Sequence, residues 1–374
     1  MKKLMVVVCF LSLILQAAPE ESAVSIGAYF LGQLPVRTAD PMGYAANQIR
    51  ALGGGPARTA ISPTWDPQPE LFVETGGLDF RPLWVKMYRP EYFGFLTAFD
   101  TVAITSYDAA SHKDGIRGEK RFRNRELYSD EQWEAYLTEV REEFRRYSFE
   151  LMKLSAQFGT RYIVLNWEAA HDCNRRQEWP ACLEYYQARL DGIGAGRQQA
   201  LAMGVNGRVL CGYEFVFLRD GVGPDHSPDS ADQVSDFLKG LKNLRGVDLW
   251  SYSSWNSIVV SDKATVAQDN AQSFHQAFSD IRNACKEQAV DCHIMIGEVG
   301  YLYDRTEFRL ALTSILETIL AEKAALVFTW TLYDDPTQVF GPRDLSHFGS
   351  FTPEGNITPH GEILQEMNRK TAKR

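Results

Sequence analysis

Glu298 is a carboxylate that the sequence places directly after a buried strand. It follows the apolar run 294–296, whose length and branching predict a strand covered on both faces, and it lies between Gly297 and Gly300. An ionised glutamate is rarely placed against a core strand unless it is paired or used in chemistry. A strand that ends in a solvated turn is the alternative interpretation. We predict that Glu298 is a functional carboxylate.

Further acids, amides and aromatic rings occur near the ends of other predicted strands. In chain order they are Tyr107, Asn166, Glu168, His171, Glu214, Tyr252, Trp255 and Trp330. Sugar rings have apolar faces that stack on aromatic side chains, and hydroxyl groups that bind polar ones. Cleavage of a glycosidic bond requires one acid and one nucleophile or base, which a pair of carboxylates supplies. These residue types together predict a saccharide site.

The elements that must position these residues alternate between strands and helices. The predicted strands are 24–33, 58–62, 101–106, 161–168, 208–217, 247–253, the stretch 292–301, and 325–332. The predicted helices are 41–52, 91–98, 129–158, 183–203, 231–244, 266–288, 307–323 and 359–368. Such alternation predicts an α/β fold with parallel strands, and at this size a single closed (β/α)8 TIM barrel.

An open doubly wound sheet is the main alternative to the barrel. It is disfavoured because no Gly-x-Gly-x-x-Gly motif follows an early strand, and because the run Gly53–Gly55 follows a helix, where glycine commonly ends the helix. A barrel gathers its chemistry at the carboxyl ends of the strands. The polar residues named above therefore belong to one predicted site.

Residues 1–18 have the pattern of a signal peptide. Lys2 and Lys3 precede the apolar segment 4–15, and small residues end the pattern before Pro19. The apolar segment is shorter than the about 20 residues of a membrane span, which disfavours the alternative of an uncleaved anchor. We expect a signal peptide at 1–18 and one barrel domain at 19–374, secreted or periplasmic and without membrane attachment after cleavage.

The charge balance and the cysteines narrow the classes of partner. Removing residues 1–18 leaves 37 basic against 48 acidic side chains, a net charge of −11, which disfavours nucleic acid as a partner. In an oxidising compartment we expect the disulfides Cys173–Cys182 and Cys285–Cys292, with Cys211 buried in a strand. Neither pair has zinc-site spacing and the seven histidines form no metal motif, so we expect no metal and no cofactor.

The strand-end motifs resemble those of the large (β/α)8 clan of retaining glycoside hydrolases that includes the cellulase-like family 5 and the family 39 enzymes. The resemblance rests on Asn166 with Glu168, on Gly297–Glu298, on Trp330 and on the tail 348–359, and it extends over nearly the whole mature chain. It implies an exported enzyme that cleaves β-glycosidic bonds of an oligo- or polysaccharide with retention of configuration.

The same resemblance implies roles for single residues. Glu298 would be the nucleophile, Glu168 the acid/base and Trp330 a platform for the sugar. Asn166 would contact the substrate, and Tyr252 would support the nucleophile or line the site. His171, Trp255 and Tyr107 are further candidates for binding sugar.

The sequence departs from the clan at the acid/base. Trp167 directly follows Asn166, so the acid, Glu168, stands one position later than in the clan. Strand side chains alternate in direction, so this displacement turns the acid to the other face unless the strand ends or bulges first. Glu214 is the substitute if Glu168 points away, and otherwise an acid that binds sugar or supports the site. Two further functions therefore stay open: a non-catalytic saccharide-binding barrel for polysaccharide assembly or adhesion, and a transglycosidase.

Overall fold

The computed structural model describes most of the expected barrel domain. The described residues are 26–30, 40–64, 79–112, 121–169, 178–216, 218, 240–261, 263–334, 339–340, 343–344 and 347–372. The predicted signal peptide 1–18, His171, Cys173 and most of the predicted helix 231–244 lie outside these ranges. Among the described helices, none combines the length and the apolar character of a membrane span.

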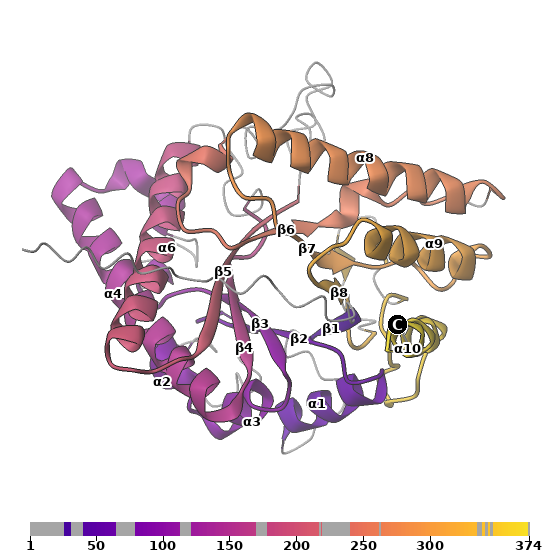
Figure 1. Cartoon of the computed structure of the whole chain (residues 1–374), viewed down its shortest axis with the longest axis horizontal. Helices are drawn as coiled ribbons and strands as arrows, with labels where there is room; N and C mark the ends of the chain where they lie inside the picture. The colour runs from indigo at the N-terminus through magenta and orange to yellow at the C-terminus, as the bar shows by residue number, and fades with distance from the viewer. Residues whose placement is uncertain are drawn as a thin grey trace, which may run out of the picture.

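A closed barrel of parallel strands forms the centre of the molecule (Figure 1). Its strands are β1 (Ile26–Phe30), β2 (Ala57–Ile61), β3 (Thr101–Ser106), β4 (Arg161–Leu165), β5 (Arg208–Phe215), β6 (Leu249–Ser253), β7 (Ile294–Val299) and β8 (Val327–Thr329). Each strand pairs with the next in sequence, and β8 pairs with β1 in the register Ile26↔Val327. The predicted single (β/α)8 TIM barrel is confirmed.

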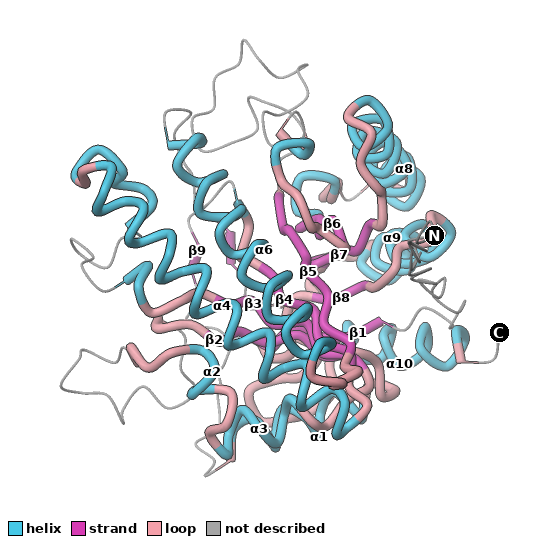
Figure 2. The backbone as a smooth tube through the Cα atoms, turned by 60° about the vertical axis from the view of Figure 1, so that its left-hand side comes forward, coloured by secondary structure: helices cyan, strands magenta, loops and turns pink. Residues whose placement is uncertain are grey.

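Helices surround this barrel on its outer side (Figure 2). They are α1 (Pro41–Ala51), α2 (Leu83–Lys86), α3 (Pro90–Leu96), α4 (Asp130–Phe158), α6 (Trp179–Ala202), α8 (Val266–Glu287), α9 (Phe308–Ala321) and α10 (Pro359–Thr371). Short 3₁₀ helices lie at Ala110–His112, Arg121–Leu127, Leu241–Asn243 and Ser254–Ser257, and the two-residue strands β9 (Val339–Phe340) and β10 (Arg343–Asp344) form a hairpin.

The longest helix, α4, has clear local signals at both ends. Ser129 and Gln132 form a capping box at its start, which satisfies two backbone N–H groups that the helix leaves without partners. Gly159 ends the helix in the left-handed conformation at φ 77°, which a residue without Cβ adopts at little cost. The buried face of α4 packs against the neighbouring helix α6. The predicted helix 129–158 is thus confirmed almost to the residue.

Several strands are shorter than the sequence predicts, and one of these differences matters for the site. The predicted strand 208–217 ends at Phe215 as β5, and the predicted strand 161–168 ends at Leu165 as β4. The last residue pair between β3 and β4 is Thr105↔Leu165, so the side chains from Asn166 onward need not alternate in direction as they would in a strand. The predicted helix 183–203 begins earlier, at Trp179, with a proline in its first turn.

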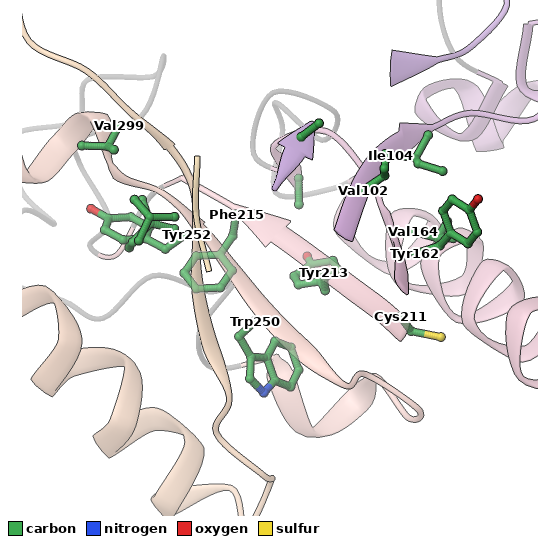
Figure 3. Packing of buried hydrophobic residues seen from close by; sticks show 14 of the residues in the cluster. Val102, Ile104, Tyr162, Val164, Cys211, Tyr213, Phe215, Trp250, Tyr252 and Val299 are labelled. Carbon is green, nitrogen blue, oxygen red and sulfur yellow. The ribbon is translucent and has the colours of Figure 1, made fainter. Parts of the chain in front are cut away.

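The barrel separates two apolar layers. The interior is filled by the buried side chains of Ala103, Ile163, Leu165, Leu249, Met295, Leu326 and Phe328. The alternate residues of each strand point outward and fill the space between strands and helices (Figure 3); they include Tyr162, Val164, Tyr213, Phe215 and Tyr252. A fully apolar floor therefore underlies whatever polar groups point inward at the carboxyl ends of the strands.

Side chains far apart in the sequence hold the closed barrel and its helices together. Asn368 in α10 accepts a hydrogen bond from Ile26 N at 2.9 Å and donates to Ile26 O at 3.0 Å, so the last helix is tied to the first strand. The predicted disulfide Cys285–Cys292 joins the end of α8 to the segment before β7. Cys182 is also disulfide-bonded, and Cys211 is free and buried in β5, as predicted.

Candidate active site

Three buried glutamates meet at the carboxyl ends of the strands. Glu168 follows β4, Glu214 lies near the end of β5 and Glu298 near the end of β7, and one carboxylate oxygen of each lies within 4.8 Å of the others. Their exposed fractions are 3%, 0% and 2%. The structure therefore brings together the two carboxylates that the sequence assigned to catalysis and the one assigned as a substitute.

The side chain of Asn166 explains how Glu168 reaches this cluster. Its Nδ2 donates to Trp167 O at 2.7 Å and to Glu214 O at 2.9 Å, and its Oδ1 accepts from Glu214 N at 2.9 Å. Asn166 thus pairs with the β5 backbone through its side chain, where a strand would use its main chain. Trp167 N donates to the Tyr107 hydroxyl at 3.0 Å. Because β4 has already ended, these contacts bend the chain and the one-residue displacement does not turn Glu168 away.

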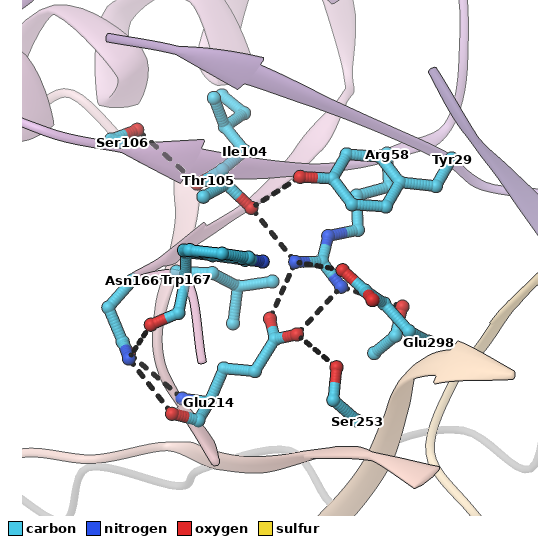
Figure 4. Close-up of polar contacts among 12 residues, drawn as sticks. Tyr29, Arg58, Ile104, Thr105, Ser106, Asn166, Trp167, Glu214, Ser253 and Glu298 are labelled. Atoms are coloured by element: carbon cyan, nitrogen blue, oxygen red, sulfur yellow. Dashed lines mark hydrogen bonds and ion pairs between the residues drawn. The ribbon is translucent and has the colours of Figure 1, made fainter. Parts of the chain in front are cut away.

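Arg58 in β2 lies at the centre of the cluster (Figure 4). Its guanidinium forms two hydrogen bonds with Glu214, Nη2 to Oε2 at 2.6 Å and Nη1 to Oε1 at 3.1 Å. It also donates to Gly297 O at 2.6 Å and to Thr105 Oγ1 at 2.9 Å, and it lies 3.6 Å from Glu298 Oε1. One fully buried cation therefore contacts two of the three carboxylates.

Glu298 is held on one side only. Trp255 Nε1 donates to its Oε2 at 3.0 Å, and Ser254 Oγ donates to its backbone oxygen at 2.8 Å. Its other carboxylate oxygen, Oε1, has the longer ion pair with Arg58 and accepts no hydrogen bond from the part of the chain that the structure describes. The charge of Arg58 orients Oε1, whose lone pairs are available to a bound molecule.

Burial and mutual repulsion shift the protonation of the cluster. Burial raises the pKa of Glu214 to about 7, with Arg58 opposing the shift and Glu168 adding to it. Burial and the charge of Glu168 raise the pKa of Glu298 well above its ordinary value, again opposed by Arg58. Carboxylates this close cannot all ionise beside a single cation, so the cluster holds a shared proton near neutral pH.

Three carboxylates could in principle hold a divalent cation, since oxygen ligands suit Mg²⁺ and Ca²⁺. Here the Arg58 guanidinium already supplies positive charge at 2.6 Å from Glu214 and 3.6 Å from Glu298. A metal ion at the same carboxylates would be repelled by that guanidinium. The donor set fits proton-transfer chemistry better than metal binding, and we assign no metal to it.

Aromatic rings border the carboxylates on the side of β1 and β8. Tyr29, Trp330 and Phe348 form a small cluster against which Trp255 packs. The Trp330 ring meets Tyr29 edge-on at 5.4 Å and Trp255 at 6.2 Å between ring centroids, and the Arg58 guanidinium lies 4.0 Å from the Tyr29 ring centroid. Trp255 therefore contacts Glu298, and Trp330 packs against Trp255.

Other predicted site residues do not line the cluster. Tyr252 stacks on Phe215 between barrel and helices, and its hydroxyl pairs with Ser257 Oγ at 2.7 Å, because its neighbour Ser253 takes the inward position in β6 (Figure 3). Tyr107 is buried, and its hydroxyl accepts a hydrogen bond from the backbone N–H of Trp167. His171 lies outside the described residues.

Sequence reasoning missed the residues that hold the acids, namely Tyr29, Arg58, Thr105 and Ser253. One signal was present. Arg58 begins a predicted buried strand and shares its face with the small residues Ala60 and Ser62. A charged residue on the inner face of a barrel strand needs a partner of opposite charge. Only the fold identifies that partner as Glu214.

Gly297 leaves the space that Arg58 and Glu214 occupy. A Cβ at this position would lie 2.9 Å from Arg58 Nη1 and 3.0 Å from Glu214 Oε1, and closer still to Ser251 Oγ. We expect Gly297→Ala to lower the free energy of unfolding by about 1–3 kcal/mol. Gly194→Ala in α6 is the control, since its Cβ meets no atom within 4 Å. Urea denaturation measures both variants, and equal stabilities would contradict the close approach at Gly297.

The contacts of Asn166 separate two roles for its amide. Both Nδ2 hydrogens are used within the protein, so we expect Asn166→Ala to misplace Glu168 and lower kcat by on the order of 10²-fold, with KM little changed. A direct contact with the sugar would instead raise KM. Asn283→Ala on the exposed side of α8 serves as the control. Steady-state kinetics on an aryl glycoside distinguish the two patterns.

Known proteins resemble this chain in fold. No family model matches the chain, and no curated protein matches its sequence. Solved structures do match. An exo-β-1,4-mannosidase from Opitutaceae bacterium strain TAV5 has a TM-score of 0.55 at 15% identity, covering 94% of this chain and 60% of that chain.

Two further structures match at similar levels. A GH5_18 protein from Streptomyces cattleya in complex with GlcNAc has a TM-score of 0.55 at 14% identity, covering 94% of this chain and 81% of its own. Endo-glycoceramidase II from Rhodococcus sp. has a TM-score of 0.52 at 14% identity, covering 92% and 78%. The chain spans less than two thirds of the length of the mannosidase and about four fifths of the other two. The chain therefore has the (β/α)8 fold of the family 5 glycoside hydrolases of clan A.

Proposed function

We propose that the chain is a glycoside hydrolase that cleaves a β-glycosidic bond with retention of configuration. The observation that carries this proposal is the approach of the Glu168 and Glu298 carboxylate oxygens to within 4.8 Å. Retaining enzymes have carboxyl groups about 5–5.5 Å apart, whereas inversion needs about 6.5–9.5 Å to admit a water between sugar and base. The short separation favours direct attack by one carboxylate on the sugar.

The two carboxylates take different roles. Glu298 attacks the anomeric carbon while Glu168 gives its proton to the departing oxygen, so the bond to the leaving group breaks as the bond to Glu298 forms. Glu168, now ionised, then takes a proton from the water that releases the sugar. Arg58 and Trp255 contact Glu298 and favour the ionised form that attacks the sugar.

The substrate class follows from the walls of the site and from the likeness of fold. Trp255 and Trp330 offer rings beside Glu298 on which a sugar can stack. Among the structures of similar fold, a GH5_18 variant from Streptomyces cattleya is in complex with Manβ1-4GlcNAc. We propose an oligo- or polysaccharide substrate with a β-linkage, and export to a secreted or periplasmic location by the signal peptide at 1–18.

A screen of glycosides tests the hydrolase proposal. The mature protein is incubated with β-mannosides, β-glucans, xylans and bacterial exopolysaccharides, and reducing-sugar release is measured. For any substrate that is cleaved, proton NMR recorded early in the reaction gives the configuration of the first product. A β-anomer from a β-linked substrate supports the proposal, and an α-anomer would rule out retention.

The raised pKa of Glu298 predicts the pH dependence. Glu298 must lose its proton before it can attack the sugar, and its raised pKa moves that loss to a pH above the ordinary carboxyl value. We expect kcat/KM to rise with pH, with the midpoint of the rise clearly above that ordinary value. A rise already complete at about pH 5 would contradict this assignment. Initial rates from pH 4 to 9 give the profile.

One alternative from the sequence loses its main support, and another remains testable. The non-catalytic saccharide-binding barrel was favoured by the displacement of Glu168, yet the Glu168 carboxylate lies with the other two. A transglycosidase uses the same two carboxylates and differs only in whether water or a second sugar accepts the glycosyl group. Products formed with and without an added sugar acceptor distinguish the two.

A further inference from the structure

Glu214 is bonded through both its main chain and its side chain to groups that hold the other two carboxylates. Its backbone N and O are bonded by Asn166, the residue that directs the chain toward Glu168. Its carboxylate is bonded to Arg58, which also lies 3.6 Å from Glu298 Oε1. Among the described residues of the cluster, it alone connects to both of the proposed catalytic acids in this way.

We propose that Glu214 is a positioning residue that, as the counterion of Arg58, sets how much of that cation's charge acts on Glu298. This inference rests on the proposed function, because it assigns Glu214 a role within the same reaction. It also replaces two expectations from the sequence, that Glu214 binds sugar or that it substitutes as the acid/base.

The carboxylate of Glu214 is bonded within the protein at both of its oxygens. Oε1 accepts from Arg58 Nη1 at 3.1 Å and from Ser253 Oγ at 2.8 Å, and Oε2 accepts from Arg58 Nη2 at 2.6 Å. All of these partners are donors, which favours the anionic form, and the side chain is fully buried. Glu214 therefore serves as the counterion of Arg58 and not as a proton donor to a sugar.

The charges around the cluster give this pair its effect on proton content. The titratable groups that face Glu214 are Arg58 from β2, Glu168 after β4, Glu298 from β7 and, through the Arg58 guanidinium, Tyr29 from β1. Thr105 and Ser253 add only neutral hydroxyls. With Arg58 and Glu214 neutralising each other, only part of the positive charge of Arg58 acts on Glu298. Without Glu214, the full charge of Arg58 would act on Glu298.

The replacement Glu214→Gln tests the charge while keeping the size of the side chain. The probe is carboxyl-¹³C-labelled glutamate, with the NMR signals of Glu168 and Glu298 assigned from their own Gln variants and followed from pH 4 to 9. We expect the pKa of Glu298 to fall by about 1 unit or more in Glu214→Gln, because a cation close to a carboxylate lowers its pKa by about that much. An unchanged titration would overturn the proposal.

A second variant keeps the test decisive if Glu214→Gln does not fold. Arg58→Met combined with Glu214→Leu removes both charges, and replacing a buried ion pair by apolar side chains of similar volume is often tolerated. Here the pKa of Glu298 is expected to rise, because the one cation that pairs with it among the described residues is gone. A pKa of Glu298 that stays at or below the wild-type value in the double variant would overturn the proposal.

Glu143 supplies the matched control. It is a half-buried glutamate in α4 whose carboxylate accepts from Leu83 N at 2.9 Å and from Ala109 N outside the barrel. Glu143→Gln removes a hydrogen-bonded carboxyl without touching Arg58, so the titration of Glu298 should not change. A shift equal to that of Glu214→Gln would assign the effect to general destabilisation and overturn the proposal.

The titration needs no turnover, so its outcome is independent of the hydrolase proposal. A wild-type protein that cleaves no glycoside but shows the expected shifts would refute the proposed function and leave the linkage between Glu214 and Glu298 standing. Where turnover is found, the rise of kcat/KM with pH in Glu214→Gln should move to lower pH, because Arg58 then acts more strongly on Glu298. If kcat/KM falls equally at every pH and the shape of the profile is unchanged, Glu214 has only a structural role and the proposal is overturned.

Discussion

Glu298→Gln is expected to abolish turnover while leaving saccharide binding largely intact. The amide keeps the size of the side chain and its contact with Trp255, but it cannot form a covalent bond to the anomeric carbon. We expect kcat to fall by on the order of 10⁵-fold or more, the scale on which loss of a covalent nucleophile acts. Steady-state kinetics and calorimetric binding of an oligosaccharide measure the two effects separately.

A smaller variant and a surface control complete this test. In Glu298→Ala, added azide can occupy the vacated space and attack an activated aryl β-glycoside in a single displacement, which gives the α-glycosyl azide and the free phenolate. Glu317→Gln on the exposed side of α9 should behave as the wild-type protein. Retained turnover in Glu298→Gln, or a β-glycosyl azide from Glu298→Ala, would remove Glu298 from the role of nucleophile.

The fold could be predicted because its signals are local and repeated. The capping box at Ser129, the left-handed end at Gly159 and the apolar strand 294–296 each specify one element without reference to the rest of the chain. Eight such alternations leave few topologies, and parallel strands of this number close into a barrel. Strand ends were less well predicted, because pairing with neighbours, and not local sequence, decided where β4 stops.

The site was predicted in part, for the same physical reason. Glu298 and Trp330 could be placed because each stands at the end of a strand with a clear apolar pattern. Tyr252 was placed on the inner face, whereas the alternation in β6 gives that face to Ser253. Arg58 was missed because its partner Glu214 lies 156 residues away in the sequence. Contacts across a barrel are set by closure, which no local pattern encodes.

Glu168 is the carboxylate whose role the sequence left most open, and its replacement separates the two steps of the reaction. In Glu168→Ala the leaving group receives no proton, so kcat/KM for a saccharide leaving group should fall by about 10²–10⁴-fold. A nitrophenyl glycoside needs no protonation to leave, so its first step should persist and the glycosyl–Glu298 intermediate should accumulate, visible as a burst of phenolate.

Azide gives the Glu168 variant an outcome opposite to that of the Glu298 variant. In Glu168→Ala, azide needs no general base and attacks the intermediate on Glu298 from the face that water would use, so two displacements give the β-glycosyl azide with retained configuration. If Glu168→Ala instead keeps full activity on an oligosaccharide, Glu168 is not the acid. Glu214 is a poor replacement for it, because three hydrogen bonds from Arg58 and Ser253 hold the Glu214 carboxylate as an acceptor.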